Sequence, residues 1–309
     1  MSVVYLSGGV GGAKLALGLS QVLGPDELTI IANTGDDFEH LGFPVCPDID
    51  TLVYTLSGLA NREQGWGRQD ESGHFMQTLK QLGGPDWFFL GDRDLAMHAT
   101  RKALMDEGLT LTEITGRLAR AVGVEHTILP MSDEEAPTTV ETVEGLLSFQ
   151  DYFVRRRAEP TVRRLHLLGG REVEATADVY GALATAELIV IGPSNPLISI
   201  DPILAVNGVR EAMAESGAPV IAVSPIVGGK AIKGPTAKMM AELGQDVSVA
   251  GIASHYSDLA THLVIDETDA PLADAVRECS MAVSVAPTVM QSLEDRIALA
   301  RHILSLSRA

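Results

Sequence analysis

The sequence contains little that would support a disulfide framework, a membrane span or a nucleic-acid-binding surface. Its 309 residues include two cysteines, Cys46 and Cys279, which lie far apart without metal-ligand spacing and are interpreted as free thiols. No window approaches the roughly 18 consecutive apolar residues of a membrane helix. The 23 Lys and Arg residues are outnumbered by 41 Asp and Glu, and a net charge of −18 repels nucleic-acid backbones and anionic membranes. Small-molecule partners are therefore expected, with neither nucleic acid nor membrane.

The apolar residues that are present indicate one large α/β protein. Hydrophobic residues make up 46% of the chain, and an apolar run and a glycine loop follow the N-terminus without a basic targeting segment, which favours a cytoplasmic enzyme. Short apolar runs alternate with helical stretches, which predicts a doubly wound, mostly parallel Rossmann-like sheet. The expected strands are Val3–Leu6, Leu28–Ala32, Trp87–Leu90, Leu188–Ile191, Val220–Val223 and Leu263–Ile265.

One region interrupts this alternation. Residues 130–178 begin with acidic, turn-rich sequence and continue with an aromatic patch and several arginines. We interpret residues 1–309 as a single catalytic unit in which approximately residues 130–178 form a small inserted subdomain or lid.

The most informative segment is Gly8-Gly9-Val10-Gly11-Gly12-Ala13-Lys14, which joins Val3–Leu6 to a helical stretch beginning at Leu15. N–H groups at a helix N-terminus lack partners, the helix dipole favours negative charge there, and glycines let a phosphate approach the backbone. The loop lacks the Gly-Lys-Ser/Thr of a P-loop, and Lys14 stands where a dinucleotide fingerprint has its third glycine. The second strand also ends in Asn33 instead of an acid. We expect a mononucleotide or phosphorylated donor; a tight turn with glycines only for close packing is the alternative.

Acidic residues follow the second expected strand. Asp36 and Asp37 end the loop Asn33–Asp37 that follows it, and Asp48 and Asp50 come about ten residues later. Ligands bind at the carboxyl ends of parallel strands, so these acids are expected near the phosphate loop. Carboxylates beside a phosphate are useful if Mg²⁺ lies between them or if one acts as a base, because like charges repel. The alternative is that Asp48 or Asp50 only caps a helix opening at Thr51.

The segment Gly91–His98 places Arg93 between two acids just before a predicted helix. Arg93 suits two-point recognition of a phosphate or an acidic heterocycle. Asp94 is expected to cap the helix at Leu95. His98 lies one turn further and is interpreted as either catalytic or structural.

Two later loops offer further donors. In Gly192–Pro196, two prolines restrict the backbone and Ser194 and Asn195 present a hydroxyl and an amide suited to a base or sugar edge, unless this is a plain β-to-α turn. Ser224–Lys230 combines glycines with Lys230, which suits a diphosphate.

Taken together, these blocks resemble the CofD family, the 2-phospho-L-lactate transferases of deazaflavin coenzyme biosynthesis. They occur in the same order over almost the whole chain, which is more specific than any single glycine loop. Cys46 stands where the family is expected to have serine and Lys102 where it is expected to have threonine, and we expect neither to contact a residue with an assigned role. The similar blocks are Gly8–Lys14, Asn33–Asp37, Pro47–Thr51 with Tyr54, Gly91–His98, Phe149-Gln150, Gly192–Pro196 and Ser224–Pro235.

The resemblance implies transfer of a phospho-organic-acid group from a guanosine-diphosphate-linked donor to the deazariboflavin Fo. The ribityl hydroxyl of Fo would attack the donor phosphate that bears the acid, and GMP would leave. The acid is phospholactyl, phosphoenolpyruvyl or 3-phosphoglyceryl, among which the sequence does not distinguish. Mg²⁺ is the implied metal and a homodimer the implied assembly.

The resemblance also implies roles for individual residues. Asp50 and Arg93 would be catalytic and contact Fo, with His98 on the same acceptor side, and Asp50 would orient the ribityl hydroxyl or accept its proton. Asp36 and Asp37 are the metal candidates. The donor-binding set is Gly8, Gly9, Gly11, Gly12, Asn33, Ser194, Asn195 and Lys230.

A second hypothesis is a nucleotide-sugar-binding regulatory protein of the related fold, without transferase activity. It shares the glycine loop. The Asp50 and Arg93 blocks discriminate between the two hypotheses, because a nucleotide sensor needs no acceptor site.

Overall fold

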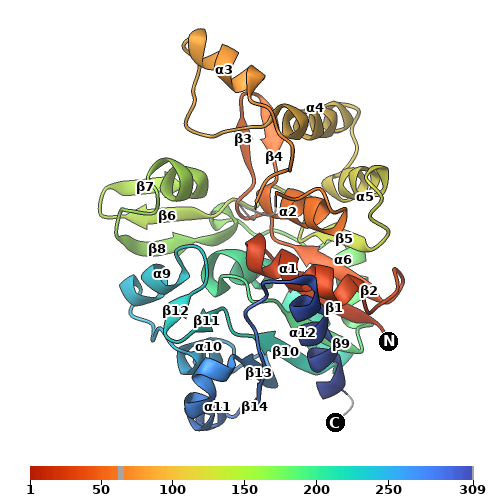
Figure 1. The fold of residues 1–309 in the computed structure, drawn as a ribbon, viewed down its shortest axis with the longest axis vertical. Coiled ribbons are helices and arrows are strands. Elements are labelled where there is room, and N and C mark those ends of the chain that lie inside the picture. The colour runs from red at the N-terminus through yellow and green to blue at the C-terminus, as the bar shows by residue number, and fades with distance from the viewer. Residues whose placement is uncertain (62–65, 308–309) are drawn as a thin grey trace.

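The computed structural model describes residues 1–61 and 66–307 and is built around a seven-stranded sheet (Figure 1). The strands lie in the order β14-β13-β10-β9-β1-β2-β5, and every neighbouring pair is parallel. The chain proceeds outward from β1 in one direction and from β9 in the other, so the order reverses between these two strands. The strands are β1 (Val3–Ser7), β2 (Leu28–Ala32), β5 (Thr127–Pro130), β9 (Leu188–Ile191), β10 (Val220–Val223), β13 (His262–Ile265) and β14 (Ala282–Val285).

The central strands are buried on both faces, which is why they are apolar without a gap. In β1, Val3 and Tyr5 join one hydrophobic core, whereas Val4 and Leu6 join the other. The first core also includes buried residues of α1 (Gly9–Ser20), α2 (Pro47–Leu56), α4 (Asp92–Asp106), α5 (Leu111–Ala121) and α12 (Leu293–Leu306). The second includes residues of α6 (Ala177–Ala184), α7 (Asp201–Ala205), α8 (Val209–Ser216), α9 (Thr236–Glu242), α10 (Val249–His255) and α11 (Ala273–Glu278). The expected doubly wound α/β fold is confirmed.

The strand expected at Trp87–Leu90 is wrong. These residues lie outside regular structure, and their rings pack on the hairpin of β3 (Phe38–His40) and β4 (Phe43–Val45), with the Phe38 and Phe88 centroids 4.8 Å apart. Periodicity alone does not separate so short an apolar run from a local cluster. After β1 and β2, the next strand of this sheet along the chain is β5, which lies at the edge. Its terminal proline made it hard to predict from the sequence, but proline is tolerated in an edge strand.

Two smaller units extend from the central sheet. The β3–β4 hairpin and α3 (His74–Gln81) belong to the long connection from β2 to β5 and project at the top of Figure 1. An antiparallel sheet of β6 (Thr139–Thr142), β7 (Gly145–Ser148) and β8 (Val162–His166) lies within the segment expected to be an insertion, at the left of the view. Its action as a lid stays a prediction. The remaining elements are β11 (Ile226–Val227), β12 (Lys230–Ala231), a π-helix at Asp151–Arg155, a π-helix at Pro196–Ile200, and two short 3₁₀ segments at Leu167–Gly170 and Glu267–Leu272.

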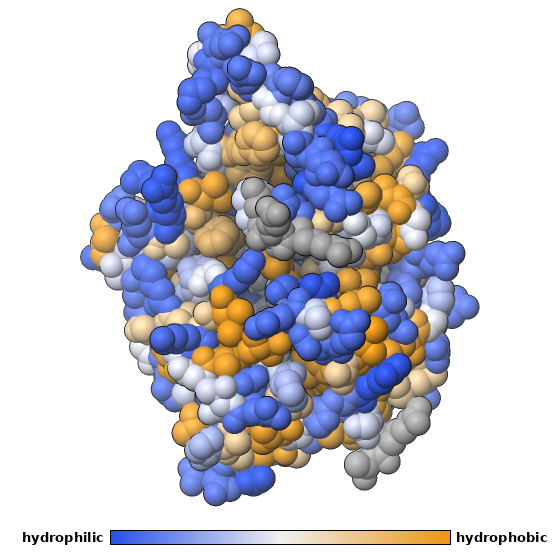
Figure 2. All heavy atoms as spheres, viewed as in Figure 1, coloured by the Kyte–Doolittle hydropathy of each residue, from blue (hydrophilic) through white to orange (hydrophobic). Residues whose placement is uncertain are grey.

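The surface agrees with the composition. Figure 2 shows mostly hydrophilic residues around the edge of this face, with apolar residues between them nearer its centre. Within residues 1–61 and 66–307, none of the helices combines the length and apolarity of a membrane span.

Candidate active site

The glycine loop lies where the strand order reverses, which is where open α/β sheets bind ligands. Gly8 precedes α1, and Gly9 adopts φ +64°, a left-handed conformation that favours glycine. The hydroxyl of Ser194, after β9, donates to the Gly8 carbonyl oxygen at 2.7 Å and accepts from the Gly8 N–H at 3.2 Å. Two of the expected donor-binding blocks are thus joined.

Glycine is also required here for close packing. A Cβ atom built on Gly11 would lie 2.5 Å from the Pro193 carbonyl oxygen, and one on Gly12 would lie 2.6 Å from the Ser194 hydroxyl oxygen. Close packing therefore requires glycine at these two positions. It does not exclude a ligand at the first turn of α1, where Val10 and Gly11 are half-buried.

A carboxylate of the chain itself lies at the N-terminus of α1. Asp48 accepts the Gly9 N–H at 2.5 Å through Oδ1 and the Asn33 amide at 2.9 Å through Oδ2. The Asn33 amide nitrogen also lies 3.3 Å from the Ile198 carbonyl oxygen and 3.5 Å from Asp36 Oδ1. Asn33, directly after β2, therefore connects Asp36 to Asp48, and through Asp48 to the N-terminus of α1.

The helix containing Asp48 and Asp50 does not open at Thr51. It begins at Pro47, with Cys46 in the N-cap position, so the alternative that either acid merely caps a helix at Thr51 is wrong. Both carboxylates belong to the first turn of α2 and contact different partners.

Three acids, the buried Asp36 and Asp48 and the half-buried Asp37, form an electrostatically costly cluster. Burial raises the pKa of Asp36 and Asp37 well above the ordinary value, and the neighbouring carboxylate of Asp48 raises that of Asp36 further. Burial likewise raises the pKa of Asp48 to about 6, although hydrogen bonds from Asn33 and Gly9 oppose the shift. A cation or protons would relieve the repulsion.

The donor atoms of this cluster suit Mg²⁺, which prefers carboxylate oxygens. Within the described ranges, no three or more His, Cys, Asp or Glu side chains are arranged to hold a metal ion. Asp36 and Asp37 fit an ion that takes one or two carboxylates and completes its shell with water and substrate phosphates, as Mg²⁺ commonly does.

Cys46 contacts one of these candidates, contrary to expectation. Its buried thiol is hydrogen-bonded to Asp37, and burial together with the nearby carboxylates of Asp37 and Asp50 raises the pKa of the thiol. Lys102, the other departure from the family pattern, pairs with Asp106 at the surface.

The raised pKa of Asp48 makes the free energy of unfolding depend on pH. The pKa of Asp48 is about 6 in the folded chain against an ordinary 3.8, so between these values Asp48 binds more proton in the folded than in the unfolded chain, and its own contribution to stability falls as the pH rises. Over the whole range between the two pKa values, this contribution of Asp48 to the free energy of unfolding falls by about 3 kcal/mol. We expect Asp48→Asn to flatten this fall between about pH 4 and pH 7, measured by urea unfolding in metal-free buffer. Parallel pH curves for the two chains would contradict the shift.

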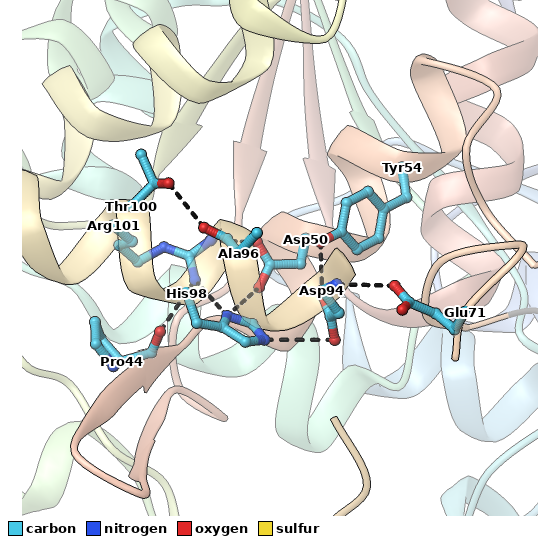
Figure 3. Close-up of polar contacts among 9 residues, drawn as sticks. All are labelled: Pro44, Asp50, Tyr54, Glu71, Asp94, Ala96, His98, Thr100 and Arg101. Atoms are coloured by element: carbon cyan, nitrogen blue, oxygen red, sulfur yellow. Dashed lines mark hydrogen bonds and ion pairs between the residues drawn. The ribbon is translucent and has the colours of Figure 1, made fainter. Parts of the chain in front are cut away.

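A second network joins α2 to α4 (Figure 3). Asp50, with 5% of its surface exposed, accepts a hydrogen bond from Arg101 through Oδ1. Its Oδ2 lies 3.7 Å from His98 Nδ1 and has no hydrogen-bond partner in the described part of the chain. Asp50 and His98, both expected on the acceptor side, are thus brought together.

Asp94 extends this network towards α2. Its carboxylate accepts the Tyr54 hydroxyl at 2.6 Å and lies 3.4 Å from His98 Nε2. Burial opposes the charge, but the contacts with His98 and Tyr54 outweigh it and lower the pKa of Asp94.

The expectation that Asp94 caps α4 is wrong. Gly91 is the N-cap residue, and the Glu71 carboxylate accepts the N–H groups of Arg93 and Asp94, each at 2.8 Å. Glu71, from a neighbouring segment, therefore caps the N-terminus of α4 in place of a side chain of the helix itself. The side chain of Arg93 is left exposed.

Asn195 and Lys230 occupy different settings. Asn195 accepts the Leu197 N–H at 3.0 Å and so caps the helix that follows β9. Lys230 is exposed on β12, and the loop before it is anchored by Asp269, whose carboxylate accepts the Gly228 N–H at 3.0 Å. For the side chains of Arg93 and Lys230 the structure records no polar contact among the described residues.

Comparison with known proteins identifies the family. A family model described as 2-phospho-L-lactate transferase CofD matches residues 3–299. The chain belongs to the CofD family. It is 39% identical to a phosphoenolpyruvate transferase of Streptomyces griseus over 313 residues, covering 99% of this chain and 98% of the relative. It is 37% identical to a 2-phospho-L-lactate transferase of Methanosarcina mazei over 302 residues, covering 98% and 99%. The protein is therefore a transferase.

Solved structures agree with the fold. A UPF0052-family protein from Bacillus halodurans aligns with a TM-score of 0.67 over 98% of each chain, at 14% identity. At that identity the likeness concerns the fold alone.

Sequence reasoning missed two residues of this CofD-family site. Arg101 contacts Asp50, and Glu71 caps α4. Arg101 had a signal, because Asp94, His98 and Arg101 recur at helical spacing and so share one face of α4. Glu71 had none, since its contact depends on how a distant segment folds back.

Proposed function

We propose that this CofD-family transferase moves a phospho-organic-acid group from a guanosine-diphosphate-linked donor to the ribityl hydroxyl of Fo, releasing GMP in deazaflavin coenzyme biosynthesis. Phosphoenolpyruvyl and phospholactyl are the leading groups, because these acids name the transferase relatives; 3-phosphoglyceryl is the third. One observation carries the proposal. The first turn of α2 contributes Asp48 to the glycine loop and Asp50 to the network on α4, so a donor site and an acceptor site would share one wall.

The donor half of the proposal rests on the joined loops after β1 and β9. The first turn of α1, near Val10 and Gly11, would receive the diphosphate, because a helix N-terminus favours anions. Ser194 and Asn195 would line the nucleoside side, and the exposed Lys230 would reach a phosphate as a mobile cation. Asp48 would then lie beside a phosphate, which its raised pKa makes tolerable.

The acceptor half rests on Asp50. Its unpartnered Oδ2 would accept the hydrogen of the ribityl hydroxyl while the hydroxyl oxygen forms a bond to the phosphorus that bears the acid. The bond from that phosphorus to the oxygen bridging it to GMP breaks, and GMP leaves with that oxygen. A phosphodiester joins the acid to Fo, and the proton resides on Asp50 until solvent removes it.

Asp36 and Asp37 would hold Mg²⁺ in this scheme. When bound, the ion would neutralise charge on the diphosphate and on the departing GMP. Homodimeric assembly stays a prediction of the family resemblance, and cytoplasmic location stays a prediction from the sequence composition.

A regulatory protein that only binds a nucleotide sugar has no use for the Asp50 network. The test is coupled consumption of Fo and release of GMP by the purified protein, followed chromatographically. Binding of guanine nucleotide without consumption of Fo would favour the regulatory hypothesis.

Replacement of Arg93 tests the acceptor site. Arg93→Ala is expected to weaken Fo binding about 10-fold, because a charge-assisted hydrogen bond to the acidic heterocycle is lost. Folding should be unaffected, since the side chain is exposed and only the backbone N–H is used by Glu71. Fluorescence titration with Fo measures the change. Arg210→Ala is the matched control, because Arg210 is an exposed arginine on α8; equal affinities for the two variants would contradict the assignment.

A further inference from the structure

The Asp50 carboxylate is held from one side by a single buried cation. Arg101 is 1% exposed, and one guanidinium nitrogen, Nη2, donates to Asp50 Oδ1. The other, Nη1, lies 3.1 Å from the Pro44 carbonyl oxygen and 3.1 Å from His98 Nδ1. Arg101 thus connects β4, α2 and α4 at one point (Figure 3).

The contact with Arg101 selects a tautomer of His98. A guanidinium nitrogen carries only hydrogens, so in a neutral imidazole His98 Nδ1 accepts and the ring proton lies on Nε2. Nε2 lies 3.4 Å from Asp94 Oδ2 and makes no hydrogen bond among the described residues. His98 Nδ1 is 3.7 Å from Asp50 Oδ2 but has no hydrogen to donate to it. This is why Asp50 Oδ2 lacks a donor although a histidine lies beside it.

An oxygen of a buried carboxylate left without a donor costs free energy, and so does burying a guanidinium. Burial opposes the charge of Arg101, yet Asp50 and its acidic neighbours outweigh that effect and raise the pKa of Arg101. The ion pair therefore fixes Asp50 at Oδ1, while Oδ2 is buried and has no hydrogen-bond partner among the described residues. Hydrogen-bonding geometry of this kind suits a carboxylate that must receive a hydrogen at a defined place.

We infer that Arg101 is a positioning residue for the transfer reaction. It fixes Asp50 through Oδ1 and holds His98 in the tautomer that gives Oδ2 no protein donor, so that the acceptor hydroxyl can supply the hydrogen once the substrate is bound. The inference rests on the proposed function, in which Asp50 receives the hydroxyl hydrogen; Arg101 itself touches no substrate.

A double-mutant cycle tests the inference. Arg101→Lys and Arg101→Met are expected to lower kcat about 10-fold and about 100-fold, with the KM for the donor within about 2-fold of wild type. In an Asp50→Asn background, Arg101→Met should lower kcat by less than about 3-fold more, because residues that act as a unit are not additive. Lys102→Met, one position along α4 at the surface, is the control and should leave kcat unchanged.

Two outcomes of the cycle would overturn the inference. One is a wild-type kcat for Arg101→Lys. The other is an Arg101→Met loss that multiplies fully with that of Asp50→Asn, which would give Arg101 a separate role. Thermal unfolding of each variant shows whether it is folded. If Arg101→Met does not fold, the cycle is measured with Arg101→Lys and Asp50→Asn instead.

Crystal structures of the wild-type and substituted chains supply a readout besides turnover. We expect the Asp50 carboxylate to rotate or become disordered in Arg101→Met and to be partly restored in Arg101→Lys. An Asp50 side chain unchanged in Arg101→Met would overturn the positioning role whatever the activity. Absence of transfer by the wild-type chain would instead contradict the proposed function, so the two failures are distinguishable.

Discussion

Asp50→Asn is expected to lower kcat by about 10³-fold while leaving the affinity for GDP nearly unchanged. The substitution keeps the shape, and its amide oxygen still accepts the hydrogen bond from Arg101. The amide nitrogen then stands in place of Oδ2, and it cannot accept a hydrogen from the ribityl hydroxyl. GDP binding should survive because Asp48, not Asp50, contacts the glycine loop. GMP release measures kcat, and calorimetric titration measures the affinity.

The matched control is Asp106→Asn on α4. Asp106 pairs with Lys102 at the surface, so its replacement should leave turnover at the wild-type level. Unchanged turnover of Asp50→Asn would remove Asp50 from the mechanism.

Gly11→Ala is expected to weaken GDP binding about 10- to 100-fold and to leave Fo binding unchanged. The added Cβ would lie 2.5 Å from the Pro193 carbonyl oxygen. Because a backbone atom cannot rotate away as a side chain can, the loops after β1 and β9 must separate, and the proposed donor wall opens. Titrations of GDP and of Fo against the same preparation separate the two effects.

Gly181→Ala is the control for Gly11→Ala. Gly181 lies in α6, and a Cβ there would meet no atom within 4 Å. We expect it to stabilise the chain by up to about 1 kcal/mol, since alanine favours the helix, with both affinities unchanged. Wild-type GDP binding by Gly11→Ala would show that these loops do not form the donor site.

The fold could be predicted where burial left a clear pattern in the sequence. Strands such as Leu188–Ile191 are buried on both faces and therefore read as continuous apolar runs. Edge strands are weaker signals. β5 ends in a proline, and β14 is half exposed, so neither was predicted. Trp87–Leu90 was mistaken for a strand because an aromatic cluster produces the same short run, although Phe89 is 51% exposed.

The candidate site was predictable as a set of loops but not as a set of contacts. The position of Gly8, Asp50 and Ser194 after strands or at a helix start indicated one crevice, and the structure joins Gly8 to Ser194. The partners came from elsewhere in the fold. Arg101 and Glu71 act through tertiary contacts with Asp50 and α4, and the use of Asp48 at the N-terminus of α1 follows from the packing of α2 on α1.

The central claim is that one crevice carries out a transfer between a guanylylated donor and Fo. Purified protein is incubated with Fo, Mg²⁺ and, in separate reactions, the guanosine-diphosphate-linked lactate, enolpyruvate and glycerate donors, and the products are identified by mass spectrometry. The account predicts, with at least one donor, a product whose mass equals Fo plus the donor minus GMP, formed in equal amount with GMP. Unchanged Fo with all three donors, while the protein still binds GDP, would contradict it.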